Sequence, residues 1–182
     1  MKHGLFSFVI QKHDATRLHY DFRLEINDVM PSWSIPKGPT LDNTVRRLAM
    51  RTPDHEMSYR TFEGVIPEGH YGAGPVMIWD TGLYTPEREI RKGERELIPD
   101  AFEGMKVMEE GLKKGELKFT LYGKKLQGSF ALVKTRGFGS NPKETWLMIK
   151  HHDDFVQANF NANDYDTYAI SGRSIEDIRT GK

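Results

Sequence analysis

Short segments in which apolar and polar residues alternate recur along most of the chain, separated by glycine, proline, asparagine or aspartate. Alternation with a period of two is typical of β-strands with one buried face, and many such segments at close spacing indicate an antiparallel barrel or sandwich. The predicted strands are Leu5–Gln11, Leu18–Ile26, Trp33–Ile35, Arg47–Arg51, Met57–Val65, Val76–Trp79, Glu116–Tyr122, Ser129–Arg136 and Trp146–Lys150.

One helix is expected among these strands, between Asp100 and Lys114. Asp100 is a suitable N-cap, and Glu103 lies three residues later as its capping-box partner. Glu87–Glu96 alternates charges of both signs, which predicts a solvated loop or edge without a function of its own. The apolar stripe of the helix consists of Phe102, Met105, Met108 and Leu112.

The chain has 182 residues, which suits one folded domain. We expect a single domain over residues 1–182, with a motif-bearing body at about 5–150 and a polar C-terminal tail at about 151–182 that packs on it. The apolar runs are too short for a bilayer helix, and the start of the chain lacks a signal-peptide cleavage site. A cytoplasmic monomer that does not bind membranes is therefore expected.

Two features of the composition limit the chemistry. The chain contains no cysteine, so any metal must be bound by histidine, aspartate, glutamate or backbone oxygen. Lysine plus arginine equals aspartate plus glutamate at 26 each, which excludes the broad basic surface of a high-affinity nucleic-acid coat. Basic residues slightly outnumber acidic ones in the first sixty residues, so a polyanion would bind there and locally.

The segment from His13 to Leu24 is the most informative part of the chain. In a strand, His19, Asp21 and Arg23 share one face, while the residues between them face the core. Two imidazoles and a carboxylate are suitable ligands for a divalent transition metal. On a straight strand His13 would lie roughly 20 Å from His19. The chain must therefore turn near residues 14–16 if both histidines bind one ion.

Arg23 continues the same face as His19 and Asp21, and its planar guanidinium matches the oxygens of phosphate or carboxylate. His55 and Tyr59 share one face if their segment is extended. A metal with these side chains suggests phosphoryl chemistry. The simpler alternative is a surface pair formed by His19 and Asp21 on an exposed strand.

A glycine-rich segment, Gly69–Pro75, lacks the lysine and serine or threonine of a phosphate-binding loop, so it is predicted to be a tight corner of the barrel, with His70 as an ordinary loop residue. Three tryptophans lie in strand segments and are expected in the core rather than as base-stacking platforms. They are Trp33, Trp79 and Trp146.

Several stretches together resemble the 3′-phosphoesterase family, which occurs as the nuclease domain of bacterial DNA ligase D and as free-standing archaeal and bacterial proteins. The resemblance covers most of residues 5–150, and its first stretch is highly specific. The stretches are Phe8–Glu25, Ser32–Pro39, Phe62–Gly74, Trp79-Asp80, Lys118–Gly128 and Trp146–Lys150.

The resemblance implies a mainly β fold, a compact antiparallel barrel with one or two short helices. It also implies a Mn²⁺-dependent enzyme, with Zn²⁺ or Co²⁺ as substitutes, that removes 3′ ribonucleotides and 3′-phosphates from DNA primer-template ends for repair. A separate DNA ligase would then act in trans. By resemblance, the metal ligands fall on His13, His19 and Asp21; the phosphate-contacting and catalytic residues on Arg23, His55 and Tyr59; and supporting polar positions on Gln11, Lys37 and Arg47.

The sequence departs from the family pattern around His55. Pro53 stands where the family commonly has an acid, and Met57-Ser58 replaces a Leu-Asp pair. The resemblance therefore does not supply a carboxylate that would orient His55. Two other functions remain open from the residues: a non-catalytic module that binds nucleic-acid ends, and an iron oxygenase whose triad would be His19, Asp21 and His55.

Overall fold

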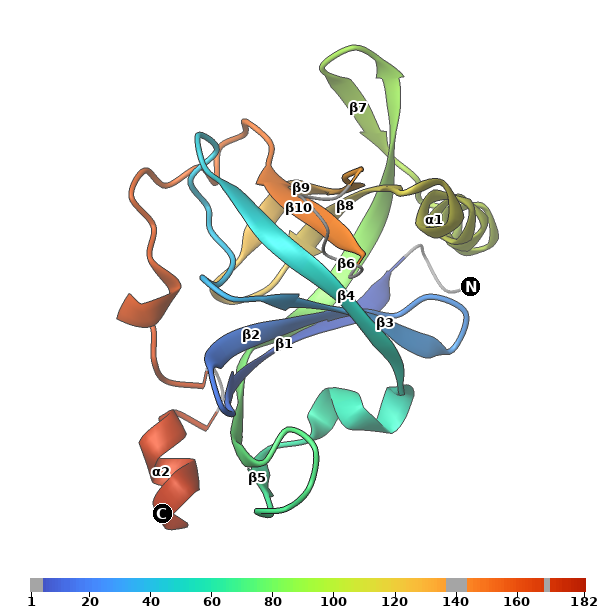
Figure 1. Cartoon of the computed structure of the whole chain (residues 1–182). Coiled ribbons are helices and arrows are strands. Elements are labelled where there is room, and N and C mark those ends of the chain that lie inside the picture. Colours follow the sequence, from blue (N-terminus) through green and yellow to red (C-terminus); the bar gives the residue numbers. More distant parts are fainter. Residues whose placement is uncertain (1–4, 137–143, 169–170) are drawn as a thin grey trace.

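The computed structural model describes residues 5–136, 144–168 and 171–182, and strands dominate it (Figure 1). Two α-helices and two short 3-10 helices accompany them: η1 (Met57–Thr61), α1 (Ala101–Lys114), η2 (Ala162–Asp164) and α2 (Ile175–Thr180). The strands are β1 (Phe6–Asp14), β2 (Leu18–Leu24), β3 (Val29–Ile35), β4 (Arg46–Glu56), β5 (Gly64–Ile66), β6 (Gly74–Arg91), β7 (Glu94–Leu97), β8 (Glu116–Tyr122), β9 (Gln127–Lys134) and β10 (Thr145–Lys150).

The strands form a closed barrel. Their order is β1-β2-β3-β4-β10-β9-β8-β6, and β6 pairs back to β1. Every pairing in this ring is antiparallel. Closure leaves no free edge within the ring, which distinguishes a barrel from a sandwich. The predicted antiparallel β-barrel with one or two short helices is therefore confirmed.

Aromatic side chains fill the barrel, as expected for a small barrel whose interior is just wide enough for side chains. The three tryptophans are completely buried, which confirms their placement in the core. Phe22 stacks on Phe119, with ring centroids 5.8 Å apart, and Trp33 meets Trp146 edge-on at 5.4 Å. This packing determines which residues of β2 and β3 face the core, and the residues that alternate with them must face outward.

The turn between β2 and β3 sets the register of the strands that carry the candidate ligands. Asn27 and Asp28 both have positive φ angles, 52° and 63°, as a two-residue type I′ hairpin turn requires. Across β2 and β3, Arg23 pairs with Ser32 and Asp21 with Ser34. A slip of one residue would exchange the aromatic and polar faces of β2, so turn and core specify the same register.

Helix α1 begins after Asp100, whose side chain accepts a hydrogen bond from the backbone N–H of Glu103, which confirms the predicted N-cap. The capping box is not formed, because the Glu103 carboxylate pairs with Arg88 instead. Met108 is buried, but Phe102 is 83% exposed. Phe102 therefore does not belong to the apolar stripe, and its inclusion there was wrong.

Two segments differ from the strand pattern expected of them. Met57–Val65 does not form one strand, because residues 57–61 form η1 and only Gly64–Ile66 pairs with β6. The charged stretch Glu87–Glu96, for which a solvated loop or edge was predicted, forms a hairpin of β6 with β7, and β7 lies outside the ring of the barrel and pairs with β6. Glu87 is buried there against Arg95 and Ser129. Alternating charges do not reveal such burial, since Ser129 comes from β9, which is distant in the sequence.

The chain after β10 lies along the barrel and ends at α2, below the β1–β2 hairpin in Figure 1. Phe160, Ala162 and Ile178 are buried in the main core. Ion pairs add to this contact, since Lys12 meets Asp166 at 2.5 Å and Arg179 meets Asp14. The segment thus covers the strand that carries His13.

Neither helix in the described part of the chain is long and apolar enough to cross a membrane.

Candidate functional site

Strands β1 and β2 place the predicted metal ligands side by side. The chain turns after Asp14, and β2 begins at Leu18, as the joint use of both histidines required. His13 pairs directly with His19 across the hairpin, with ring centroids 4.9 Å apart. Asp21 follows two residues later on the same face, as the alternation of β2 predicted. His13 and His19, which are six residues apart in the chain, are therefore neighbours in space.

The three side chains converge on one point. Asp21 Oδ2 lies 3.6 Å from His13 Nδ1 and 3.3 Å from His19 Nε2. One ligand atom from each of His13, His19 and Asp21 lies within 4.8 Å of the others. These separations suit ligands of a single ion, so the group could hold a metal ion.

The outer nitrogen of each imidazole faces a backbone carbonyl. His13 Nε2 lies 2.6 Å from the oxygen of Gly72, and His19 Nδ1 lies 2.9 Å from the oxygen of Arg17. Because a carbonyl only accepts, each outer nitrogen carries the proton and donates it. When a ring is deprotonated, its inner nitrogen is then the one that is free to bind a metal, as in many histidine metal sites.

Opposing effects set the charge of Asp21. Burial alone would raise the pKa of its carboxyl, but hydrogen bonds from His13 and His19 and the charge of Arg23 hold that pKa well below its usual range. Burial likewise lowers the pKa of His19, yet the interactions with Asp21 outweigh it and raise that pKa. The carboxylate therefore stays ionised at neutral pH, as a metal ligand must.

Arg23 is buried beside this group, although the sequence placed it on a polar face. Its Nε donates to Gln11 Oε1 at 2.7 Å, and its Nη1 donates to Ser32 Oγ at 2.9 Å. Its Nη2 lies 3.4 Å from Asp21 Oδ2. These contacts hold the guanidinium plane in one orientation, with one edge toward Asp21.

His55, at the end of β4, joins the site through Arg23. Its Nδ1 lies 3.0 Å from Arg23 Nη1 and 3.1 Å from the oxygen of Pro53. A guanidinium only donates and a carbonyl only accepts, so Nδ1 can satisfy one of them at a time. Burial and the charge of Arg23 lower the pKa of His55, which keeps the ring neutral near pH 7.

The unusual residues before His55 can be located in the structure. Pro53 offers its carbonyl oxygen to the imidazole where an acidic side chain is usual. Asp54 pairs with Arg51 instead, at 2.8 Å. The register of β3 and β4 shifts at this point, between the pairs formed by Met30 and Ser32. The group of Pro53 that faces His55 is therefore a backbone carbonyl and not a carboxylate.

Tyr59 reaches the site from η1 rather than from a strand. Its ring lies 4.7 Å from that of His55, and the Arg23 guanidinium lies 4.9 Å from its centroid. Burial raises the pKa of the Tyr59 hydroxyl, so it stays protonated. The expectation that an extended segment aligns the two rings was wrong, but the helical turn still brings them together.

Gln11 is completely buried, and its hydrogen bonds are all made to the protein. Its Nε2 donates to the carbonyl oxygens of Tyr59 at 2.9 Å and Phe62 at 3.0 Å, while its Oε1 accepts from Arg23. Gln11 therefore connects Arg23 to η1 and positions both.

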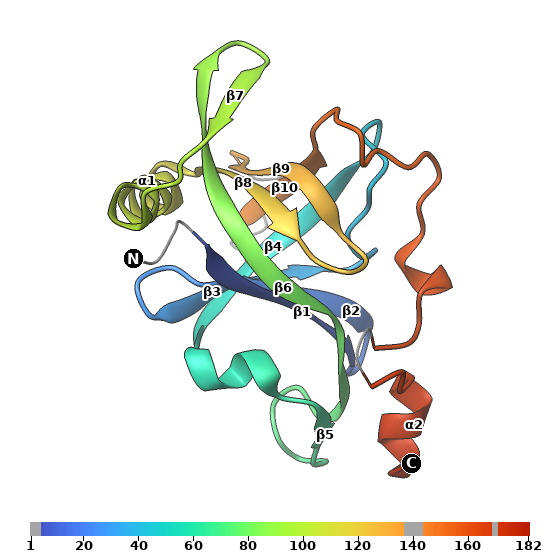
Figure 2. The same cartoon turned by 180° about the vertical axis from the view of Figure 1, so that it is seen from behind.

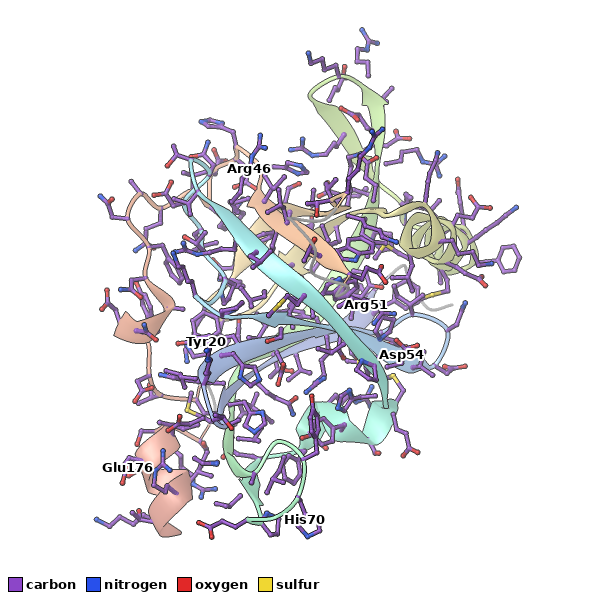
Figure 3. The ribbon with its side chains drawn as sticks, in the orientation of Figure 1. Tyr20, Arg46, Arg51, Asp54, His70 and Glu176 are labelled. Atoms are coloured by element: carbon purple, nitrogen blue, oxygen red, sulfur yellow. The ribbon has the colours of Figure 1, made fainter. Side chains whose placement is uncertain are left out.

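Lys37 and Arg47 do not belong to the group of side chains around Arg23 and the two histidines. Lys37 is exposed in the turn after β3, and Arg47 Nε donates to the carbonyl oxygen of Gly38, the residue after Lys37. Figure 3 labels Arg46 and Asp54 near opposite ends of β4, so Arg47 and His55 are distant along this strand.

The site also contains partners that the sequence did not identify. They are Ser32, which accepts from Arg23, and the carbonyls of Arg17 and Gly72 behind the two histidines. The pairing of β2 with β3 could have identified Ser32. The backbone carbonyls carry no side-chain signal, so sequence patterns could not reveal them.

His55 does not lie in the group that could hold a metal, because its Nδ1 faces the Arg23 guanidinium. The triad expected of an iron oxygenase is therefore not assembled. Instead, the fold and site define a class of protein: a small closed β-barrel whose candidate metal centre lies beside a buried arginine, an arrangement suited to an anionic substrate.

Comparison with known proteins identifies the family within this class. Residues 11–134 match the DNA Ligase D 3′-phosphoesterase domain, and the chain belongs to this family. Over 150 residues, 82% of this chain, it is 45% identical to the multifunctional non-homologous end joining protein LigD of Pseudomonas aeruginosa. It is 40% identical over 150 residues to the corresponding DNA repair protein of Mycobacterium tuberculosis. The match covers 16% of the length of each of these relatives.

Proposed function

We propose that this protein is a manganese-dependent phosphoesterase that processes 3′ ends of DNA, removing terminal ribonucleotides as a phosphodiesterase and 3′-phosphates as a phosphomonoesterase. The observation that carries the proposal is the convergence of His13, His19 and Asp21 next to the buried guanidinium of Arg23. Membership of the phosphoesterase family supports the reaction class. The relatives named for non-homologous end joining support DNA ends as the substrate.

His13, His19 and Asp21 would hold the ion, with Zn²⁺ or Co²⁺ as possible substitutes for Mn²⁺. When bound, the ion polarises a phosphate oxygen and lowers the pKa of a water molecule. The protein's own contribution is to orient the two imidazoles through the carbonyls of Arg17 and Gly72 and to keep the carboxylate of Asp21 ionised through its contacts with His13 and His19 and the positive charge of Arg23.

Arg23 stabilises negative charge on the phosphorus centre. Its orientation is fixed by Gln11, Ser32 and Asp21 before substrate arrives, so little reorganisation accompanies the reaction. Tyr59 stays protonated and can donate its hydroxyl to a second phosphate oxygen. Both groups act on phosphate oxygens, which carry no base identity, so cleavage should depend little on sequence.

His55 acts as a neutral hydrogen-bond donor. When its Nδ1 accepts from Arg23, the ring proton resides on Nε2, the nitrogen on the other side of the ring. The lowered pKa opposes a permanently charged imidazolium. His55 therefore stabilises the phosphoryl oxygens rather than delivering a proton from a charged ring.

Lys37 and Arg47 would add positive charge away from the metal group, and there they would contact the DNA backbone beyond the scissile phosphate. The chain carries no net charge, so this attraction is local and should weaken as salt rises. The protein would act as a cytoplasmic monomer, and a separate DNA ligase would seal the ends that it produces.

A labelled primer-template with one 3′ ribonucleotide tests the proposal. Wild-type protein stripped by chelation should be inert and should regain cleavage with Mn²⁺, yielding first a 3′-phosphate and then a 3′-hydroxyl end. Asp21→Ala should lose both manganese and activity while the barrel remains folded. Activity that survives exhaustive chelation would refute the metal role, and equal hydrolysis of 5′-phosphates would refute the proposed end specificity. Binding of the DNA end without any product would favour a non-catalytic module.

A further inference from the structure

The loop between β5 and β6, residues 67–73, carries the most exposed large apolar side chain in the described part of the chain. Tyr71 has a relative exposure of 103%, so the protein itself contributes almost nothing to its surroundings. A single exposed aromatic residue is common on protein surfaces. Tyr71 differs from such residues in two ways. Its loop is held by hydrogen bonds, and the loop contacts His13 of the candidate metal centre.

The backbone of this loop is held in a defined shape. Gly69 and Gly72 have φ angles of 85° and 74°, a region that suits glycine. The backbone N–H of His70 donates to Pro67, and that of Ala73 donates to His70, at 3.3 and 3.1 Å. These two turns present the tip of the loop outward, and Figure 3 shows the labelled His70 at its outer end.

The loop is also tied to a candidate ligand. The carbonyl oxygen of Gly72 accepts the hydrogen bond from His13 Nε2 at 2.6 Å. Gly72 packs so closely that a Cβ there would lie 3.2 Å from His13 Cε1. Consecutive Cα atoms are about 3.8 Å apart, so Tyr71 stands directly beside the residue that touches the ligand. The exposed ring of Tyr71 thus belongs to the residue next to the one that contacts His13.

We propose that Tyr71 is a stacking platform for the 3′-terminal nucleobase of the strand whose phosphodiester lies at His13, His19 and Asp21. This inference rests on the proposed function. A ring free of protein neighbours offers its face to any base, and stacking on an aromatic side chain strengthens binding by about 5-fold to 150-fold per base. Tyr71 would position the terminal nucleotide without reading its identity, in agreement with contacts that otherwise go to phosphate.

A fluorescence measurement tests stacking without requiring cleavage. A primer with 2-aminopurine as its 3′-terminal base is titrated with metal-free protein. Wild type and Tyr71→Phe should quench the fluorophore, and Tyr71→Ala should bind the primer without this quenching. Phe102→Ala is the matched control, because Phe102 is an exposed aromatic residue on α1, 83% exposed, and should change nothing. Equal quenching by wild type and Tyr71→Ala would overturn the proposal.

A second measurement combines the variant with a modified substrate. Two primers are compared with Mn²⁺, one with a normal 3′ ribonucleotide and one whose terminal ribose carries hydrogen in place of the base. Tyr71→Ala should lower kcat/KM about 5-fold to 150-fold on the normal primer, mainly through KM, and should have little effect on the primer without the base. Equal losses on both primers would mean that Tyr71 does not contact the base.

Manganese content separates this inference from a structural role of the loop. Tyr71→Ala should retain manganese like wild type, because the backbone carbonyl of Gly72 remains in place. Loss of manganese in this variant would mean that Tyr71 supports His13, and would overturn the proposal. If wild type cleaves neither primer, the proposed function fails, while the 2-aminopurine titration still decides whether the base stacks.

Discussion

The guanidinium of Arg23 is held by protein contacts before any substrate binds. Gln11, Ser32 and Asp21 each contact a different nitrogen, and the ring of Tyr59 lies against its plane. A buried charge is tolerated only when paired and hydrogen-bonded, and these contacts meet that need. The position of the guanidinium is thus set by its protein contacts, so the role of each residue around it can be tested by a single substitution.

Arg23→Lys keeps the positive charge and removes the planar set of donors. We expect kcat/KM to fall about 30-fold to 10³-fold, equivalent to roughly 2 to 4 kcal/mol of transition-state stabilisation, because a point charge cannot reproduce the directed N–H donors of the planar guanidinium. Steady-state kinetics on the ribonucleotide-ended primer measures this loss. Since Arg23 is buried, denaturant unfolding must show that the variant is folded. Turnover equal to wild type would mean that Arg23 only attracts the polyanion.

His55→Ala should retain manganese and lose roughly 10²-fold or more in rate. Because burial and Arg23 lower the pKa of His55, the ring is neutral across the working range. The ratio of wild-type to variant rates should therefore stay constant from about pH 6.5 upward and should shrink as wild type is protonated below that. A pH–rate profile of both proteins measures the ratio. A limb at higher pH that vanishes in the variant would instead indicate proton transfer, and loss of manganese would place His55 among the ligands.

At the scale of elements, the hairpin of β1 and β2 carries the candidate ligands, and the start of β6 lies against it. Gly74, the first residue of β6, has a φ angle of 132° and lies against the backbone of Asp14, next to His13. A Cβ at residue 74 would collide with the carbonyl oxygen of Asp14. The end of β1 and the start of β6, which are distant in sequence, can thus pack together only because residue 74 has no side chain.

Gly74→Ala should lower the free energy of unfolding by about 2 kcal/mol or more and weaken manganese binding, because the hairpin end must move away from β6. Gly69→Ala is the matched control: its φ is also positive, at 85°, but a Cβ there meets nothing within 4 Å. That variant should show only the strain of the backbone angle, about 1 kcal/mol. Urea unfolding and calorimetric titration with Mn²⁺ measure both effects. Equal behaviour of the two variants would refute the role of the close approach.

At the scale of the whole molecule, a second buried polar cluster lies apart from the candidate site. Glu87, Arg95, Ser129 and His151 join β6, β7, β9 and the end of β10. Figures 1 and 2 place β7 and the β5 loop at opposite ends of the molecule. His151 Nδ1 lies 2.7 Å from Ser129 Oγ. This arrangement separates groups that set stability from groups proposed to set activity.

The cluster should make the fold sensitive to acid. Burial, and then the charges of Arg95, Lys150 and Lys118, lower the pKa of His151 from 6.5 to about 4, against an opposing effect of Asp153. Between these values the unfolded chain binds a proton that the folded chain does not, so the free energy of unfolding falls as pH drops through this window.

His151→Gln should remove this part of the acid sensitivity, up to about 3 kcal/mol between pH 6.5 and 4. His152→Gln is the control, because His152 is exposed and adjacent in sequence. Urea unfolding at pH 7.5, 5.5 and 4.5 measures the difference between the two variants. Parallel pH dependence of both variants and wild type would show that His151 does not contribute.

The sequence by itself determined the barrel strands and the polar face of β2, because alternation with period two fixes which side chains share a face. Tyr20, Phe22 and Leu24 are buried in the core as expected, and Asp21 and Arg23 lie on the other side. His13 and His55 were also candidates from the residues, but only the resemblance gave them roles, because the local pattern left their positions relative to β2 open. Local periodicity sufficed wherever one strand alone decides the orientation of a side chain.

Only the tertiary structure decided how distant segments meet. The pairing of His13 with His19, the carbonyl of Gly72 behind His13 and the burial of Arg23 depend on register, on the β5–β6 loop and on η1. The hairpin of Glu87–Glu96 and the burial of Glu87 depend likewise on partners from β8 and β9. A backbone carbonyl has no sequence signature, and the cost of burying a charge depends on neighbours far along the chain. The candidate ligand residues could therefore be selected from sequence, whereas their orientation and their charged surroundings follow from the closure of the barrel.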